Sequence, residues 1–312
     1  MDRRAAALDP SEAAGRARER FVDSLLVAWE PAADPAPGQR TFEVVRDALL
    51  VSPALAERNV RVYLHGAHAG DTLVRADEPV DVVIESGTSY LAGFTPHVSE
   101  LARQHIQGGL AAGSWDYWQY QREVFAALRQ AFPGAVRETD HGIRVLHTSL
   151  SVSHPTPPAQ VTVALPYRHY SGLGGWTAGI TYFTRGFDQV VQYPRLHRDN
   201  GALKDRETEG RYKATVRMAK QLRDYLQDVL MLEPGRVPSY YLECLLWNVP
   251  ARKYAAEHPA ERLREVVRYL EGAYLPAFEQ QHMIESLFGP APTQWATSDA
   301  RLFIDAAGRW LG

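Results

Sequence analysis

The chain has 312 residues, 45% of them hydrophobic and 10% aromatic, with a net charge of -3 and a mean hydropathy of -0.31. A chain of this size buries about three quarters of its unfolded surface, which argues against pervasive disorder and favours two lobes over one core. The near-neutral charge argues against a surface built as a whole for nucleic acid or acidic membranes. A single cysteine, Cys244, excludes an intrachain disulfide framework.

The beginning of the chain carries no membrane or secretion signal. Residues 1–20 are rich in arginine and alanine and include Asp9 and Glu12, which is typical of a helix or a frayed arm rather than a signal peptide. No uncharged apolar stretch approaches the ~20 residues that a membrane-spanning helix needs. We therefore expect no membrane partner and a cytoplasmic location.

The hydrophobic pattern predicts a mixed first part and a helical second part. Apolar residues at helical spacing predict helices over residues 21–29, 42–58, 98–106 and 115–132, with a break at residues 34–39. Alternating and β-branched runs predict strands over residues 60–64, 80–84, 143–152, 160–165 and 177–184. From residue 211 onward the pattern is almost wholly helical, with breaks at residues 234–238 and 290–292. We therefore predict a mixed α/β lobe over residues 1–190 and a helical lobe over residues 191–312.

The most informative segment joins the first two predicted strands. The first strand runs into a turn made of Gly66 and a small residue, Ala67, and Thr72 follows six residues after the glycine. The second strand carries one acidic residue, Asp81, in an otherwise apolar run. This order of elements resembles the nucleotidyltransferase superfamily of polymerase-β type, which implies a mixed sheet followed by a helical C-terminal lobe.

The chemistry of that superfamily explains why a glycine turn is followed by acidic residues at i and i+2 of the next strand. A Gly-Ser turn holds a triphosphate through backbone N–H groups, and an Asp-x-Asp pair on the next strand holds two divalent metal ions. Side chains at i and i+2 share one face of a strand, so both carboxylates reach the same pair of metals. The metals activate the attacking hydroxyl and clamp the triphosphate.

The second half of the chain narrows the resemblance. Residues 193–197, 211–220 and 238–250 look like the corresponding segments of the CD-NTases, the cyclic-oligonucleotide synthases of bacterial anti-phage defence. Relatives of these enzymes are cyclic GMP-AMP synthase and oligoadenylate synthase. In that family a lysine and a serine hold the triphosphate and an aromatic residue stacks on the base. The resemblance implies a nucleotide-binding set of Gly66, Ala67, Thr72, Lys220, Ser239 and Tyr240.

A basic stretch supports an anionic ligand independently of the family. Residues 195–223 contain nine Lys or Arg against four Asp or Glu. Lys213, Arg217 and Lys220 fall on one helical stripe at i, i+4 and i+7, which suits a nucleotide, an oligonucleotide or a nucleic acid. The alternative is an ordinary solvated face, paired with Glu207, Glu209 and Asp224.

The sequence departs from the family at the metal site. Ala67 replaces the serine of the turn, and Pro79 occupies the position of the first metal-binding aspartate, so that only Asp81 is retained. The third acid of the family falls at Val163, or at Thr162 in another register. Residues 141–187 contain no Asp or Glu at all, so no shift of register restores that acid.

Neighbouring acids are poor substitutes. On an extended strand Glu78 points to the face opposite Asp81, and Asp77 lies roughly 13 Å from it at about 3.3 Å per residue. Paired catalytic metals lie only about 3.5–4 Å apart. One carboxylate cannot hold two magnesium ions, because these demand octahedral oxygen coordination.

We therefore predict an inactive CD-NTase-like protein, a pseudoenzyme that binds a nucleotide, an oligonucleotide or a partner protein from a defence operon. An active nucleotidyltransferase that makes a cyclic or linear oligonucleotide is the first alternative, with its missing acids supplied by another chain or an unusual loop. Magnesium is a cofactor only in that case. A pure protein-interaction module is the second alternative.

Other residues have two interpretations each. His65 and His68 with Asp81 suggest a transition-metal site, but a pair at i and i+3 without a third clustered ligand is typical of histidines satisfied within the fold. Ser239 is a nucleophile only with a His–Asp pair, and nothing in the sequence marks one; a phosphate contact or a helix cap fits better. Cys244 lies in an apolar helical run and is predicted to be inert.

Two further features are predicted to be structural. The aromatic cluster of residues 115–120 suits either stacking on bases or a role in a core or an interface, and the second is more common. Its members are Trp115, Tyr117, Trp118 and Tyr120. Glu243 lies among apolar neighbours, and the resemblance implies a structural role for it.

Overall fold

The computed structural model describes residues 10–108, 117–148, 156–172 and 175–312. The chain divides into two compact units, residues 33–202 and residues 1–32 together with 203–312. We call them the sheet unit and the helical unit. This grouping assigns the N-terminal helix α1 (Pro10–Trp29) to the C-terminal helices, whereas the sequence division kept it with the sheet.

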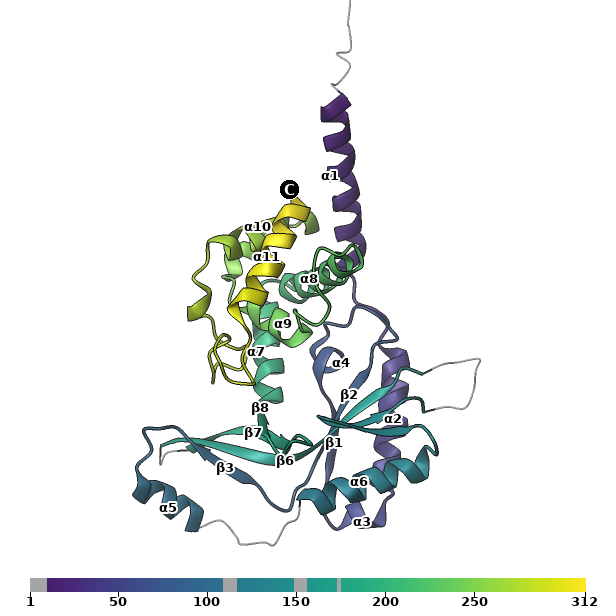
Figure 1. Cartoon of the computed structure of the whole chain (residues 1–312), viewed down its shortest axis with the longest axis vertical. Helices are drawn as coiled ribbons and strands as arrows, with labels where there is room; N and C mark the ends of the chain where they lie inside the picture. Colours follow the sequence, from purple (N-terminus) through teal and green to yellow (C-terminus); the bar gives the residue numbers. More distant parts are fainter. Residues whose placement is uncertain (1–9, 109–116, 149–155, 173–174) are drawn as a thin grey trace, which may run out of the picture. The chain divides into compact units, whose positions relative to one another are not determined.

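The strands of the sheet unit form an eight-stranded mixed sheet (Figure 1). Its main path runs β1-β2-β6-β5-β4, with β3 and β7 paired to the far half of β6 and β8 paired to β7. β1 and β5 pair antiparallel with β2 and β6 respectively, whereas β2 and β6 are parallel. The bounds are β1 Arg61–Leu64, β2 Val80–Glu85, β3 Leu91–Phe94, β4 Val136–Thr139, β5 Gly142–Val145, β6 Ala159–Gly172, β7 Gly175–Phe183 and β8 Gln189–Gln192.

One face of this sheet is covered by helices α2 (Ala36–Leu50) and α6 (Tyr117–Ala131), as Figure 1 shows. Because side chains alternate along a strand, every second residue of β2 and β6 enters that core, for example Val82 opposite Val161. The intervening residues face the other way. These include Asp81, which pairs with Gln160 of β6. They also include Thr162, the next residue of β6 on that face, which pairs with Val83.

β6 is longer than the predicted strand, which ended before Pro166. The strand continues because its parallel neighbour changes at this point. β2 pairs with β6 as far as Ala164, and β3 takes over from Tyr167. Pro166, which has no N–H to donate, therefore interrupts no hydrogen bond on that side.

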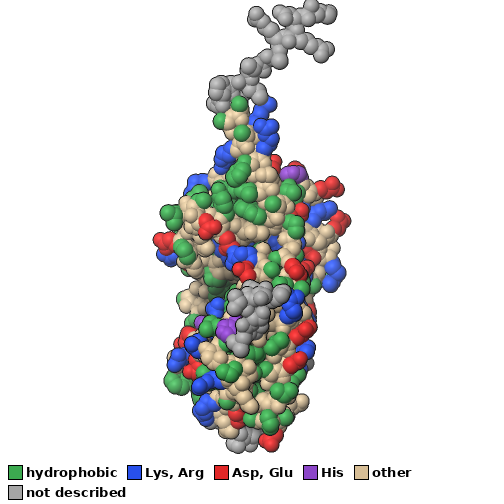
Figure 2. Space-filling model, turned by 90° about the vertical axis from the view of Figure 1, so that its right-hand side faces the viewer, with side chains coloured by type: hydrophobic (Ala, Val, Ile, Leu, Met, Phe, Trp, Pro, Cys, Tyr) green, Lys and Arg blue, Asp and Glu red, His purple; other side chains and the backbone are tan. Residues whose placement is uncertain are grey.

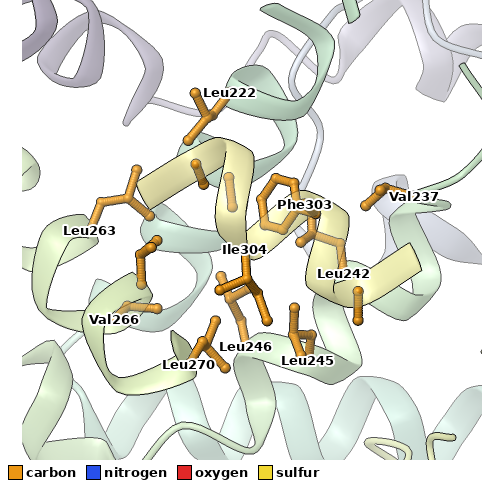
Figure 3. Packing of buried hydrophobic residues seen from close by; sticks show 14 of the residues in the cluster. Leu222, Val237, Leu242, Leu245, Leu246, Leu263, Val266, Leu270, Phe303 and Ile304 are labelled. Atoms are coloured by element: carbon orange, nitrogen blue, oxygen red, sulfur yellow. The ribbon is translucent and has the colours of Figure 1, made fainter. Parts of the chain in front are cut away.

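The helical unit has one large hydrophobic core (Figure 3). Leucines of α8, α9 and α10 converge on Phe303 and Ile304 of α11. The bounds are α7 Pro194–Glu207, which crosses the division at residue 202, α8 Arg211–Asp228, α9 Ser239–Trp247, α10 Pro259–Gly272 and α11 Thr297–Leu311, with 3-10 turns at Ala251–Tyr254 and Leu275–Ala277.

Prolines determine both ends of the helix predicted over residues 42–58, and both ends differ from the prediction. The helix predicted over residues 42–58 begins earlier, at Ala36, because a proline in the first helical turn needs no N–H partner. It ends at Leu50, and the separate short α3 (Pro53–Ala56) follows. The predicted helix at residues 98–106 is α5 (Glu100–Gly108). The four-residue strands β3, β4 and β8 were not predicted.

Charged groups of both signs share the surface. On the face shown in Figure 2, Lys and Arg side chains are interspersed with Asp and Glu, in keeping with the net charge of -3. Among the helices of the described residues, none is both long enough and apolar enough to span a lipid bilayer.

Candidate functional site

The turn after β1 brings four of the predicted residues together. Gly66 begins the short helix α4 (Gly66–Gly70) with a φ of +60°, and the N–H of His65 donates to the Asp81 carbonyl over 2.8 Å. The buried Thr72 donates its backbone N–H to the Ala67 carbonyl over 3.1 Å. The strand–turn–strand unit predicted from the sequence is therefore formed as expected.

The position of Asp81 and the backbone conformation both favour glycine at residue 66. A β-carbon built on Gly66 would lie 2.2 Å from Oδ2 of Asp81, closer than any real contact, and the left-handed φ disfavours other residues. The Asp81 carboxylate therefore lies directly against the backbone of the turn.

A pocket of about 670 Å³ opens beside the turn. Residues of the turn line it, and so do residues at the beginning of α7. Its lining residues are Tyr63, Leu64, His65, Gly66, Ala69, Gly70, Pro194, Arg195, His197, Arg198 and Asp199. Backbone amides of a glycine-rich turn beside arginines are suited to anions.

The register of β2 and β6 decides which residue replaces the third acid. Thr162 lies on the face that Asp81 occupies, whereas Val163 is 1% exposed and belongs to the core behind the sheet. Gln160, opposite Asp81, donates its amide to Thr139 Oγ1 over 3.0 Å. Asp81 thus has only neutral oxygen donors beside it on β6.

The other carboxylates nearby are already engaged. Glu78 accepts the backbone N–H groups of Val74 and Arg75 over 3.3 and 3.1 Å. Glu85 shares the face of Asp81 but lies four residues further along, roughly 13 Å away on an extended strand. It is buried and accepts hydrogen bonds from Arg61 (2.5 Å) and Tyr63 (2.9 Å).

This set of donors does not fit two magnesium ions. Two-metal sites need several carboxylates that bridge ions about 3.5–4 Å apart. Across the described ranges, no three His, Cys, Asp or Glu side chains are grouped closely enough to hold a metal ion. His65 and His68 are therefore not part of such a group within the described ranges either. The His68 ring instead packs against Gly38 of α2.

A second pocket, of about 480 Å³, lies on the same sheet unit further along β2 and β6. The Arg168 guanidinium is stacked between the rings of Tyr90 (3.7 Å to the centroid) and Trp176 (4.5 Å). Arg61 and Arg195 also line this pocket, and Glu85 is its one carboxylate among the described lining residues. Cationic groups on aromatic walls favour a planar, anionic ligand.

No local pattern in the sequence predicts this second pocket. Its residues come from the loop after β2 and from β1, β6, β7 and α7, so no local spacing connects them. One polar group within it is unusual: the Ser89 hydroxyl is buried and has no hydrogen-bond partner within the described part of the chain.

The other three predicted nucleotide-binding residues belong to the helical unit. Lys220 is 1% exposed, and its ammonium pairs with the Glu243 carboxylate over 2.5 Å. Ser239 begins α9, and its hydroxyl accepts a hydrogen bond from Arg223 over 2.9 Å. The Tyr240 hydroxyl donates to Gln280 over 2.7 Å, and burial is the main cause that raises the Tyr240 pKa.

The cationic stripe of α8 is largely engaged within the unit. Besides Lys220, Arg217 donates to the Glu30 carbonyl over 2.8 Å. Two flanking arginines pair with acids named in the solvated-face interpretation, Arg211 with Glu209 and Arg223 with Asp224. The stripe is therefore not a freely presented cationic surface, because Lys220 and Arg217 both have partners within the unit.

Two structural predictions are confirmed. Cys244 is fully buried, and burial raises the pKa of its thiol to about 12. Tyr117 and Tyr120 belong to the core behind the sheet, where their hydroxyls donate to backbone carbonyls of β6 and β2. Trp118 packs on Phe183, and Trp115 lies outside the described residues.

Comparison with known proteins identifies a family profile and several relatives that match this chain. The profile of the cGAS/DncV-like nucleotidyltransferase C-terminal helical domain matches residues 199–312. The chain is 31% identical to the cyclic UMP-AMP synthase of Rhodothermus marinus over 291 residues, which are 90% of this chain and 94% of that protein. It is 26% identical to the cyclic dipyrimidine nucleotide synthase CdnE of Cecembia lonarensis, over 80% of this chain and 83% of that protein.

A solved structure is similar over the same length. The Rhodothermus marinus CdnE c-UMP-AMP synthase with Apcpp and Upnpp superposes with a TM-score of 0.79 at 29% identity. The match covers 91% of this chain and 94% of that chain.

Proposed function

Because this chain belongs to the CD-NTase family, we propose that it binds nucleoside triphosphates on the sheet unit but carries out little or no nucleotidyl transfer. The observation that carries the proposal is that only Asp81, of the three acid positions implied by the family, still holds a carboxylate. Its neighbours at the two other acid positions are Pro79, which has no donor atom, and Thr162, which has a neutral one. Nucleotidyl transfer by two metal ions would lack the carboxylate charges that hold both ions in place.

Retention of nucleotide binding is supported by the preserved turn. Gly66 keeps the left-handed backbone with which α4 begins, and residues of this turn line the pocket beside it. The relative from Rhodothermus marinus was solved with two nucleotide analogues, Apcpp and Upnpp. The second pocket, with Arg168 between two aromatic rings, provides space and chemistry for another nucleotide.

For Lys220, Ser239 and Tyr240, which belong to the helical unit, a nucleotide contact stays a separate proposal that the resemblance implies. Each is already fixed by a partner in the helical unit, Glu243, Arg223 and Gln280 respectively. A role in bacterial defence or signalling, together with a partner protein from a defence operon, belongs to the same proposal.

Active synthesis is a second candidate function. It is favoured by the 31% identity to a cyclic UMP-AMP synthase over 94% of that protein's length. In that case Asp81 would hold magnesium together with carboxylates from another chain or from a loop. The product would be a cyclic or linear oligonucleotide.

One experiment separates the two. The purified protein is incubated with all four nucleoside triphosphates and Mg²⁺ or Mn²⁺, and the products are analysed by liquid chromatography and mass spectrometry. We expect no product above the level of Asp81→Asn. Robust synthesis that Asp81→Asn abolishes would overturn the proposal in favour of the active enzyme.

Binding is measured separately. A rise in melting temperature and a calorimetric affinity for nucleoside triphosphates are expected even where no product forms. If no nucleotide or oligonucleotide is bound, the protein-interaction module becomes the better description.

A further inference from the structure

Arg195 occupies a singular position beside the turn. It is the second residue of α7, is exposed, and lines both pockets of the sheet unit. Within the described residues no carboxylate lies at ion-pair distance from its guanidinium, whereas the neighbouring Arg198 pairs with Asp199 over 2.9 Å. Arg195 is therefore a cation whose charge is available to a ligand in the pocket.

The balance of charge at the site has changed with the loss of the acids. Three carboxylates and two divalent cations give a two-metal site a net charge of about +1. Among the residues that line the pocket, Arg195 contributes one positive charge and the Arg198–Asp199 pair none, whereas Asp81 lies against Gly66 of the turn and does not line the pocket. The lining thus carries the unpaired positive charge of Arg195 without any metal ion, so a phosphate chain meets none of the repulsion that three carboxylates would exert.

The guanidinium is also chemically suited to the role. Its N–H donors form a planar fork that binds phosphate oxygens in a bidentate manner, and it stays charged over the whole accessible pH range. It lies close enough to Tyr63 to oppose the rise in the pKa of that phenol, which burial and then Glu85 produce. The charge of Arg195 therefore acts on Tyr63, a residue that lines both pockets.

We propose that the pocket beside the turn binds the phosphates of a nucleotide without a divalent metal ion, with Arg195 supplying the positive charge. This inference rests on the proposed nucleotide binding and goes beyond it. The turn amides and the guanidinium together replace the contacts that magnesium provides elsewhere in the superfamily.

The test is the affinity for ATP, measured by titration calorimetry on the full chain in EDTA and in Mg²⁺. We expect equal affinities within about twofold. Arg195→Gln should weaken binding in EDTA about tenfold or more. The matched control is Arg137→Gln, since Arg137 is an exposed arginine on β4, at the opposite edge of the main sheet path.

A second variant should change the affinity for ATP in opposite directions, depending on whether binding is metal-free or mediated by magnesium. Asp81→Asn removes a negative charge beside the phosphates, so metal-free binding should become tighter. Where magnesium mediates binding, the same change should weaken it. Binding that disappears in EDTA but persists in Mg²⁺ would overturn the inference and leave the proposed function intact. An absence of ATP binding under both conditions would overturn both.

Discussion

The Asp81 carboxylate lies against the backbone of Gly66, so that a β-carbon at residue 66 would come within 2.2 Å of Oδ2. Gly66→Ala therefore meets two penalties, the contact itself and a left-handed φ of +60° that costs about 1–2 kcal/mol for other residues. We expect the turn to shift and the melting temperature to fall, with nucleotide affinity reduced more than tenfold.

A matched control lies four residues along the same turn. A β-carbon on Gly70 would meet Thr72 Oγ1 at 3.5 Å, an ordinary contact. Gly70→Ala should therefore keep the melting temperature near that of the unmodified chain. Equal effects of the two substitutions would show that the geometry at Gly66 is not what positions the turn.

Removing one partner of the Lys220–Glu243 pair should be costly. Both side chains are almost fully buried, and their charges are 2.5 Å apart. Lys220→Met leaves a buried carboxylate without its cation, which typically costs about 3–5 kcal/mol. The measurement is urea unfolding of the single variant.

The double variant Lys220→Met/Glu243→Leu separates charge from packing. Because it removes both charges together, we expect it to be more stable than Lys220→Met alone. A double variant at least as unstable as the single one would contradict an ion-pair role. Loss of nucleotide binding in Lys220→Met alone is therefore ambiguous, and binding should be compared in the double variant.

The sequence predicted the parts of the site that local spacing encodes. The strand, the glycine turn and Asp81 follow one another in the chain, and the structure forms them as expected. Which of Thr162 and Val163 faces Asp81 depended on the register between two strands far apart in sequence, so both alternatives stayed open until β2 and β6 were seen paired.

Long-range pairing also explains what the sequence missed. The short strands β3, β4 and β8 have four residues each, too few for a clear alternation, and are held by neighbours distant in the chain. The stripe of cations on α8 was correctly periodic, but its partners Glu30 and Glu243 lie in other helices or beyond them. Periodicity identifies a face without identifying what covers it.

The Cys244 thiol should be unreactive in the native protein. It is fully buried, its sulfur accepts the Gln281 N–H over 3.3 Å, and its pKa is raised to about 12. Because the thiolate is the reactive form, Ellman's reagent at pH 8 should label no thiol in the folded chain and one after unfolding in guanidinium. Rapid native labelling, absent in Cys244→Ala, would show that this part of α9 opens readily.

His68 should make the fold sensitive to mild acid. Both its ring nitrogens are buried without a hydrogen-bond partner in the described part of the structure, and burial lowers its pKa from the ordinary 6.5. The unfolded chain takes up the proton near pH 6.5 and the folded chain only at lower pH. Stability from the neutral ring is therefore present above pH 6.5 and is lost as the pH falls towards the folded pKa.

Replacing the imidazole by a side chain that cannot be protonated should remove this dependence. We expect the melting temperature of His68→Leu to fall less than that of the unmodified chain between about pH 7.5 and 5.5. Gly70→Ala, which leaves every ionisable group in place, should keep the full dependence. Parallel curves for His68→Leu and the unmodified chain would mean that the ring takes up its proton without opening the turn.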